Sequence, residues 1–314
     1  MTPLARALEL AERGRGTTYP NPIVGAVVVA PGGEVVSEGW HERCGESHAE
    51  VLALVAAGER AAGSTLYVSL EPCAHHGTTP PCADAVLAAG VAKVVVGSLD
   101  PNPEAAGGVA RLRAAGVEVE VVDSFEARQQ NEAWRTWISL GRPFVTYKVA
   151  ATLDGRVTVP GSRWVTGEEA RRLVHELRAQ VDAVAVGMGT VHADAPRLDA
   201  RGVDAARQPR RLAFGSGPLP QGSDLELRAG GLQEELAALA ADGVQSLLLE
   251  GGPTLATAFF EAGLVDRLLV FVAPTLSGAG PHLIGQLAAP LPLTRLAVRP
   301  LGSDVLVEAY VNEP

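Results

Sequence analysis

The stretch that decides the fold is Glu71-Pro-Cys-Ala-His-His-Gly-Thr-Thr-Pro-Pro-Cys82, which follows His48-Ala-Glu50 by a short distance in the chain. The run before it, residues 64–70 (STLYVSL), is rich in β-branched and aromatic residues and predicts a strand. The run after it, residues 83–89, has helical composition, and so have residues 49–57. Two predicted helix N-termini therefore place the ligand-rich segments near one point, where helix dipoles favour thiolates.

One histidine nitrogen and two cysteine sulfurs form a ligand set that suits Zn²⁺, so we predict His48, Cys73 and Cys82 as zinc ligands. Three protein ligands leave the fourth tetrahedral position for water. His-x-Glu followed by Pro-Cys and a second Cys is the zinc-deaminase signature, in which the glutamate, here Glu50, is the general acid/base. The alternative is two buried cysteines and a capping histidine, which the scarcity of cysteine in this chain disfavours.

Length and composition favour a two-domain globular protein. The chain has 314 residues, 47% of them hydrophobic and 20% charged, so each half can bury its own core. A formal charge of −10 argues against non-specific nucleic-acid binding, although a local arginine cluster could still hold a phosphorylated small molecule. No apolar run approaches a membrane span, and the three cysteines form no disulfide framework, so we expect a cytoplasmic location.

In the first half, strands and helices alternate, which predicts a three-layer α/β/α domain. Asp100-Pro-Asn-Pro103 follows one predicted strand, at the end where ligands of open α/β sheets bind. Cys44 has no motif around it and is interpreted as a structural thiol. The elements expected here, besides those above, are helices over residues 2–13 and 107–115 and strands over residues 26–29, 34–38, 92–97 and 117–122.

A helix is expected over residues 125–140, and Gly141-Arg-Pro143 ends it, so we place the domain boundary between residues 1–142 and 143–314. The second half repeats strand–helix units with a glycine-rich turn at residues 187–190 and another at 251–254. The latter opens a predicted helix, residues 255–262, where free backbone N–H groups can meet a phosphate. Neither turn has the Gly-x-Gly-x-x-Gly fingerprint. Strands are expected over residues 144–150, 182–187, 211–214, 245–250 and 267–272.

These motifs resemble those of the bifunctional deaminase–reductases of riboflavin biosynthesis over nearly the whole chain. The resemblance implies a cytidine-deaminase-like α/β/α domain followed by a dihydrofolate-reductase-like α/β domain that uses NADPH. It also implies two reactions: hydrolytic deamination of 2,5-diamino-6-ribosylamino-4(3H)-pyrimidinone 5′-phosphate, then reduction of the ribose of 5-amino-6-(5-phosphoribosylamino)uracil to ribityl. The cofactors implied are one zinc ion per chain and NADPH. The expected partners are the phosphorylated substrate and further copies of the chain, as a dimer or tetramer.

In the deaminase half, the resemblance assigns Asn21, His41 and His75 to the substrate. Taken alone, Asn21 before a proline could cap a turn, and His41 could be a surface side chain. In the family that the chain resembles, the position of Thr78 is usually Lys or Arg, where it would meet the substrate phosphate. Phosphate binding in this half must therefore rely on other groups.

In the reductase half, the resemblance implies two sets of contacts. Lys148 is a candidate proton donor, and Glu250 is expected to orient the sugar. Arginine suits phosphate oxygens, although a single arginine is more often a solvated charge. The positions matching the family's dinucleotide contacts are Ala150, Trp164, Thr190, Asp194, Ser216, Gly252, Pro253 and Thr254. Those matching its ribose-phosphate contacts are Ser162, Arg178, Leu198, Arg201 and Glu250.

Two rival hypotheses remain at this point. The first is a nucleoside or tRNA deaminase with an unrelated second domain, which the acidic charge and the long insertion between Cys73 and Cys82 disfavour. The second is a catalytically silent zinc module whose second half mediates assembly. Glu50 opposes it, because a structural zinc site closes its fourth position with another ligand and needs no acid/base.

Overall fold

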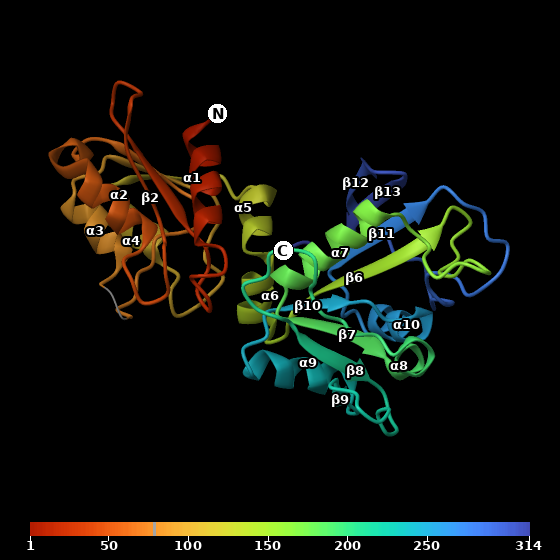
Figure 1. Ribbon diagram of the computed structural model, residues 1–314. Coiled ribbons are helices and arrows are strands. Elements are labelled where there is room, and N and C mark those ends of the chain that lie inside the picture. The colour runs from red at the N-terminus through yellow and green to blue at the C-terminus, as the bar shows by residue number, and fades with distance from the viewer. Residues whose placement is uncertain (78–79) are drawn as a thin grey trace. The chain divides into compact units, whose positions relative to one another are not determined.

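The computed structural model describes residues 1–77 and 80–314, so Thr78 lies outside the described residues. The chain divides into two units, one formed by residues 1–140 with Pro314 and the other by residues 141–313 (Figure 1). Each unit is built on its own β-sheet.

The first unit contains a five-stranded sheet in the order β2-β1-β3-β4-β5. β1 runs antiparallel to both of its neighbours, and β3, β4 and β5 are parallel. The carboxyl ends of β3 and β4 therefore meet at one edge, and the two ligand-rich loops follow these ends. The strands are β1 (Gly25–Val29), β2 (Val35–Trp40), β3 (Thr65–Val68), β4 (Lys93–Val96) and β5 (Glu118–Val121).

Helices cover both faces of this sheet, which confirms the predicted three-layer arrangement (Figure 1). Alternation along β1 explains the layers: Ala26 and Val28 pack against α2, α3 and α4, whereas Val27 and Val29 pack against α1. The zinc motif lies on two helix starts, because His48 is the N-cap of α2 and Cys82 is the first residue of α3. The helices are α1 (Pro3–Ala11), α2 (Ala49–Ala57), α3 (Cys82–Ala88) and α4 (Gly108–Ala114), with 3₁₀ turns at Glu12–Gly14 and Gly58–Ala61.

The single helix predicted over residues 125–140 is wrong. The structure has two helices, α5 (Phe125–Gln130) and α6 (Glu132–Leu140), separated at Asn131. The Asn131 amide donates to the carbonyl oxygen of Ile23 at 2.9 Å and accepts from the N–H of Ile23 at 3.0 Å. This side chain pairs with a distant backbone segment, and its own backbone leaves the helical region at φ −114°.

The second unit contains an eight-stranded sheet in the order β12-β13-β11-β6-β10-β7-β8-β9. The six strands from β11 to β9 are parallel, and β13 and β12 extend the sheet in antiparallel fashion. The β12–β13 hairpin was not predicted, because nearly every side chain of β12 is exposed and shows no alternation. The strands are β6 (Phe144–Thr152), β7 (Ala183–Gly187), β8 (Arg210–Phe214), β9 (Glu226–Arg228), β10 (Ser246–Leu249), β11 (Arg267–Ala273), β12 (Thr294–Leu301) and β13 (Asp304–Tyr310).

Two helices pack on each face of this sheet. Ala183 and Ala185 of β7 belong to the cluster that α9 and α10 cover, whereas Val184 and Val186 face α8. α7 packs against Phe271 and its neighbours on the latter side. Both glycine-rich turns lead into helices, at the N-termini of α8 and α10. The helices are α7 (Glu168–Gln180), α8 (Met188–Asp194), α9 (Leu232–Ala241) and α10 (Pro253–Glu261).

Candidate active sites

The three predicted zinc ligands lie together in the first unit. The side-chain ligand atoms of His48, Cys73 and Cys82 all fall within 4.8 Å of one another. His48 Nδ1 is 3.1 Å from the Sγ of Cys82 and 3.7 Å from that of Cys73. Zinc bonds of about 2.1 Å to nitrogen and 2.3 Å to sulfur separate tetrahedral ligand atoms by roughly 3.5–3.8 Å. The donor set therefore fits zinc, and the three ligand atoms lie close enough together to share one ion.

The electrostatics of the two thiols also fit a cation. Donation from Cys82 lowers the pKa of Cys73, and His48 acts in the same direction. The neighbouring Cys73 and burial raise the pKa of Cys82. Two adjacent buried thiols cannot both ionise unless a positive charge lies between them. A divalent cation supplies that charge and allows both sulfurs to bind as thiolates.

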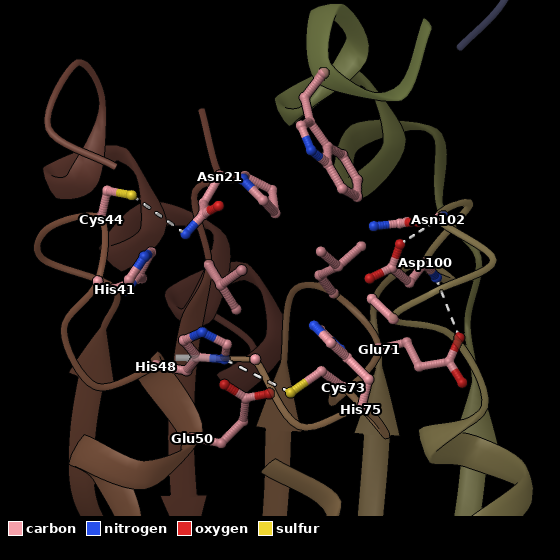
Figure 2. Close-up of a pocket in the computed structure, with 17 residues that line it drawn as sticks. Asn21, His41, Cys44, His48, Glu50, Glu71, Cys73, His75, Asp100 and Asn102 are labelled. Atoms are coloured by element: carbon pink, nitrogen blue, oxygen red, sulfur yellow. Dashed lines mark hydrogen bonds between the residues drawn. The ribbon is translucent and has the colours of Figure 1, made fainter. Parts of the chain in front are cut away.

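Glu50 lies beside this triad, at a cavity of about 330 Å³ that His48 and Cys73 also line (Figure 2). Its carboxyl group is almost completely buried. Burial raises the pKa of Glu50 to about 7, an effect that His48 opposes. A carboxyl group that titrates near neutral pH can both take up and release a proton. The volume is sufficient for a single heterocyclic substrate.

The residues that the resemblance assigns to the deaminase substrate all line this cavity: Asn21, His41 and His75. His41 is 2% exposed, its Nδ1 lies 3.2 Å from the Ser47 carbonyl oxygen, and its Nε2 has no partner among the described residues. A buried ring nitrogen without a partner at a cavity wall is consistent with ligand binding. Because burial lowers the pKa of His41, the neutral ring is favoured there.

Glu71 connects the zinc loop to the loop after β4. Its carboxylate accepts from the backbone N–H groups of Asp100 at 3.2 Å, Gly107 at 3.2 Å and Val109 at 2.9 Å. A Cβ on Gly108 would lie 1.7 Å from the Pro72 carbonyl oxygen, so only glycine allows these two loops to approach so closely. The packing of these loops brings Asp100 and Asn102 to the cavity wall.

Sequence reasoning missed two residues of this cavity. Trp134 of α6 lines it, is only 7% exposed, and belongs to no hydrophobic cluster among the described residues. Cys44, interpreted above as a structural thiol, is exposed, and its sulfur lies 3.8 Å from Asn21 Nδ2 (Figure 2). No motif marks either residue. For Trp134, the residue that comes closest to a sequence signal is Asn131, because its pairing with Ile23 fixes the start of α6.

A buried ion triad lies in the second unit, at the carboxyl edge of its parallel strands. Glu250, which follows β10, accepts from Arg178 of α7 at 2.6 and 3.0 Å and lies 3.6 Å from the Nζ of Lys148 on β6. Burial acts to raise the pKa of Glu250, but Lys148 and Arg178 lower it. Burial lowers the pKa of Lys148. Three residues that the resemblance assigned to the reductase chemistry are thus in contact.

The remaining predicted reductase residues follow the same strand ends. Thr190 of α8 and Gly252, the N-cap of α10, are adjacent, because a Cβ on Gly252 would lie 3.6 Å from Thr190 Oγ1. Ser162 Oγ donates to the Trp164 carbonyl oxygen at 2.8 Å in the loop before α7. The others are Ala150 on β6, Asp194 at the end of α8, Leu198 and Arg201 in the following loop, Ser216 after β8, and Pro253 and Thr254 at the start of α10.

Among the described residues, no hydrogen bond or ion pair joins Asp194 or Ser216 to the other residues of this set. Pro253 and Thr254 extend the exposed start of α10 next to Gly252. Backbone N–H groups at such a start, together with small side chains around them, suit a dinucleotide phosphate. The arrangement therefore fits NADPH at this edge.

The two folds and their sites define a class: a zinc-dependent hydrolytic deaminase joined to an α/β reductase. Comparison with known proteins agrees. Residues 2–98 match the cytidine and deoxycytidylate deaminase zinc-binding region, and residues 143–307 match the RibD C-terminal domain. The chain belongs to the RibD family of riboflavin biosynthesis proteins. It is a bifunctional deaminase and reductase with zinc and NADPH as its cofactors, and both predicted domain folds are confirmed.

Full-length relatives support this membership. The chain is 41% identical to the Aquifex aeolicus riboflavin biosynthesis protein RibD, over 96% of this chain and 95% of that protein. It is 41% identical to the Escherichia coli protein over 88% of each chain. The Acinetobacter baumannii RibD structure superposes with a TM-score of 0.82 at 36% identity, covering 98% of this chain and 97% of that one.

A Thermotoga maritima structure superposes with a TM-score of 0.83 at 33% identity, covering 98% and 97% of the two chains. That protein is described as a diaminohydroxyphosphoribosylaminopyrimidine deaminase and 5-amino-6-(5-phosphoribosylamino)uracil reductase. In the part of the present chain that the structure describes, no helix is both long and apolar enough to span a membrane.

Proposed function

We propose that residues 1–142 deaminate 2,5-diamino-6-ribosylamino-4(3H)-pyrimidinone 5′-phosphate and that residues 143–314 reduce the ribose of the deaminated product. The observation that carries this proposal is that the two clusters of candidate catalytic residues lie in different units. The His48, Cys73 and Cys82 triad with Glu50 lies in the first unit, and the Glu250 triad lies in the second. The substrates named for the Thermotoga maritima protein support the choice of substrate.

His48, Cys73 and Cys82 hold the zinc ion in this proposal. When bound, zinc supplies the Lewis acidity that makes water nucleophilic at neutral pH. Glu50 accepts a proton from that water as the oxygen attacks C2 of the pyrimidine. Glu50 then gives a proton to the 2-amino nitrogen, the C2–N bond breaks, and ammonia leaves. Its position at the cavity and its pKa near 7 support both proton steps.

The cavity walls hold the pyrimidine in this proposal. Asn21, His41 and His75 contribute polar groups, and Asp100 and Asn102 add others from the facing loop. Trp134 contributes an apolar aromatic side chain to the cavity wall, so we propose that the part of its indole that reaches the cavity packs on the planar ring. The polar groups then select the ring edge, and the indole excludes water.

The carboxyl edge of the second sheet holds the reductase substrate. Arg178, Leu198, Arg201 and Ser162 contact the ribose phosphate, and Glu250 orients the sugar hydroxyls. NADPH, when bound, supplies the hydride for C1′ of the ribose. The ring oxygen that leaves C1′ needs a proton, and Lys148 is the candidate donor. Lowering of its pKa by burial favours this role.

The cofactor contacts proposed for NADPH are Ala150, Trp164, Thr190, Asp194, Ser216 and the Gly252-Pro253-Thr254 segment. Gly252 stands at the start of α10 without a side chain, so a phosphate can approach the helix N–H groups directly. Thr190 lies beside Gly252 and can extend that contact from α8. These positions share the strand ends where ligands of open parallel sheets bind.

A homo-oligomer, either a dimer or a tetramer, belongs to the proposal, as does a cytoplasmic location. Support for assembly comes from the edge strand β12, where Leu296 is 67% exposed and Val298 is 61% exposed. An apolar, unpaired strand edge is a surface that soluble proteins usually cover. Three free cysteines fit a reducing compartment. Light scattering on the wild-type chain and on Val298→Lys tests the assembly, and a wild-type monomer would contradict it.

The experiment that tests the function is to incubate the purified chain with zinc, NADPH and the diaminopyrimidine phosphate, following ammonia and NADPH absorbance together. We expect ammonia release first and NADPH oxidation after it. Cytidine, supplied in parallel, should not react. Rapid cytidine deamination with no turnover of the phosphorylated pyrimidine would favour the nucleoside deaminase instead. Absence of ammonia with a fully loaded zinc site would favour the silent module.

A further inference from the structure

The segment that follows α8 has an unusual backbone. Ala195 and Leu198 have positive φ angles of 41° and 55°, in the left-handed region that non-glycine residues rarely adopt. The Leu198 side chain is 2% exposed and packs with Met188 and Val191, which fixes one side of the turn. Such a conformation persists only where surrounding groups hold it.

The carbonyl group of the next residue, Asp199, is held by two donors from α7. His175 Nδ1 lies 3.1 Å from the Asp199 carbonyl oxygen, and Arg178 Nη1 donates to the same oxygen at 3.2 Å. A carbonyl oxygen can only accept, so His175 carries its proton on Nδ1. The backbone next to the left-handed Leu198 is thus tied to one helix.

The side chain of Asp199 holds the arginines around it. Its carboxylate accepts from Arg201 Nη1 at 2.5 Å and forms an ion pair with Arg197 Nη2 at 2.8 Å. Arg201 keeps a half-exposed guanidinium, so its other N–H groups can meet a ligand. Asp199 therefore links Arg201 to α7: its carbonyl group is bound by α7 and its carboxylate binds Arg201.

Arg178 has further partners, whereas the one hydrogen bond of the His175 side chain among the described residues is to Asp199. An arginine has five N–H donors; Arg178 uses two for Glu250 and one for Asp199, which leaves two for a substrate. His175 lies three residues before Arg178 and therefore shares its side of α7. Burial, Arg178 and Arg201 all lower the pKa of His175, so it adds no charge to the cluster at neutral pH.

We propose that His175 is a positioning residue of the reductase site: it holds the Asp199 carbonyl group, and through Asp199 it fixes Arg201 where the substrate phosphate binds. The inference rests on the proposed function, in which Arg178 and Arg201 contact the ribose phosphate. His175 does not touch the substrate. It sets the affinity for the phosphorylated sugar and takes no part in the hydride or proton steps.

The test compares His175→Leu, which removes the donor, with His175→Asn, whose side-chain N–H can occupy the place of Nδ1–H. Arg172→Leu is the matched control, because Arg172 of α7 is exposed and, among the described residues, pairs only with Glu176. We expect His175→Leu to raise the reductase KM for 5-amino-6-(5-phosphoribosylamino)uracil by about 3- to 10-fold, the worth of one net hydrogen bond. kcat, the KM for NADPH and ammonia release should stay near wild type, and His175→Asn should recover most of the loss.

A second measurement separates positioning from a general structural effect. With the same aminouracil lacking its phosphate, His175→Leu and wild type should give equal KM values, because Arg201 then has no phosphate to hold. An equal loss on both substrates, or a His175→Asn enzyme as impaired as His175→Leu, would overturn the inference. If Arg201→Ala raises KM while His175→Leu does not, the inference alone fails. If Arg201→Ala leaves KM unchanged, the proposed substrate site fails with it.

Discussion

The backbone N–H of Cys82 donates to the Sγ of Cys73 at 3.3 Å, so the residue that offers one zinc ligand also orients the other. This contact closes the base of the insertion between them, which is eight residues long. His48 completes the triad from the N-cap of a different helix. Since the described residues offer three protein ligands at this point, one coordination position stays open for chemistry.

Zinc content tests this arrangement directly. The purified chain should hold about one zinc ion, and Cys82→Ser should lose much of it together with all ammonia release, because a neutral hydroxyl is a poorer ligand than a thiolate. Cys44→Ser is the matched control for zinc content, since Cys44 is exposed and lies outside the triad. Metal analysis and ammonia release measure both. Full zinc occupancy in both Cys73→Ala and Cys82→Ala would sink the assignment.

Glu50→Gln should separate metal binding from proton transfer. Glutamine keeps the size of the side chain but cannot carry the proton, so zinc should remain while ammonia release falls by ~10²–10⁴-fold. Glu46→Gln is the control, because Glu46 is exposed and pairs only loosely with Arg43. Near-normal turnover of Glu50→Gln would show that another residue moves the proton.

Trp134 gives a test of the cavity wall. Trp134→Leu should raise the deaminase KM by roughly 10-fold or more, because base–aromatic stacking contributes about 1–3 kcal/mol per base. Trp134→Phe should keep most of the affinity, since it retains an aromatic face. NADPH oxidation with the deaminated substrate reports whether each variant is folded. Equal loss in the leucine and phenylalanine variants would argue against stacking.

The zinc site was predictable from the sequence because its chemistry lies in residue types with few other uses. His-x-Glu and the second prolyl-cysteine pair stand at predicted helix starts, the first prolyl-cysteine pair follows a predicted strand, and the structure brings these segments to one point. The sheet strands were predictable for a similar reason. Val94, Val95 and Val96, for example, form one continuous buried run.

What the sequence could not reveal depends on contacts between distant segments. Asn131 breaks a helix because its amide pairs with Ile23, more than a hundred residues earlier, and no local pattern encodes that pairing. The same contact fixes the start of α6 and thereby places Trp134 at the cavity wall. The β12–β13 hairpin escaped prediction because β12 lacks a buried side in the single chain.

In the reductase site, too, some features depend on contacts between distant segments and could not be predicted from the local sequence. Taken alone, Arg178 would be interpreted as a solvated charge, and only the fold reveals its fork around the buried carboxylate of Glu250. His175 had no sequence signal, because its partner is a backbone carbonyl group in a left-handed turn. Backbone conformations of this kind are set by packing, here around Leu198, and composition does not report them.

The final prediction concerns the independence of the two activities. Gly252 is the N-cap of α10 with φ −65°, and an added Cβ would meet only Thr190 Oγ1 at 3.6 Å, an ordinary contact. Gly252→Asp should therefore fold, and an aspartate at this position should even stabilise the helix. Its negative charge, however, stands where the cofactor phosphate is proposed to bind. NADPH affinity should fall strongly while ammonia release continues.

Gly231→Asp provides the matched control, because Gly231 is the N-cap of α9 with φ −64° and no proposed cofactor contact. It introduces the same charge at the same helix position in the same domain. Ammonia release and NADPH turnover should be measured on both variants and on Glu50→Gln, which should still oxidise NADPH when given the deaminated substrate. If folded Gly252→Asp binds NADPH as tightly as Gly231→Asp, the phosphate does not lie at α10 and the cofactor site must be sought elsewhere on the sheet edge.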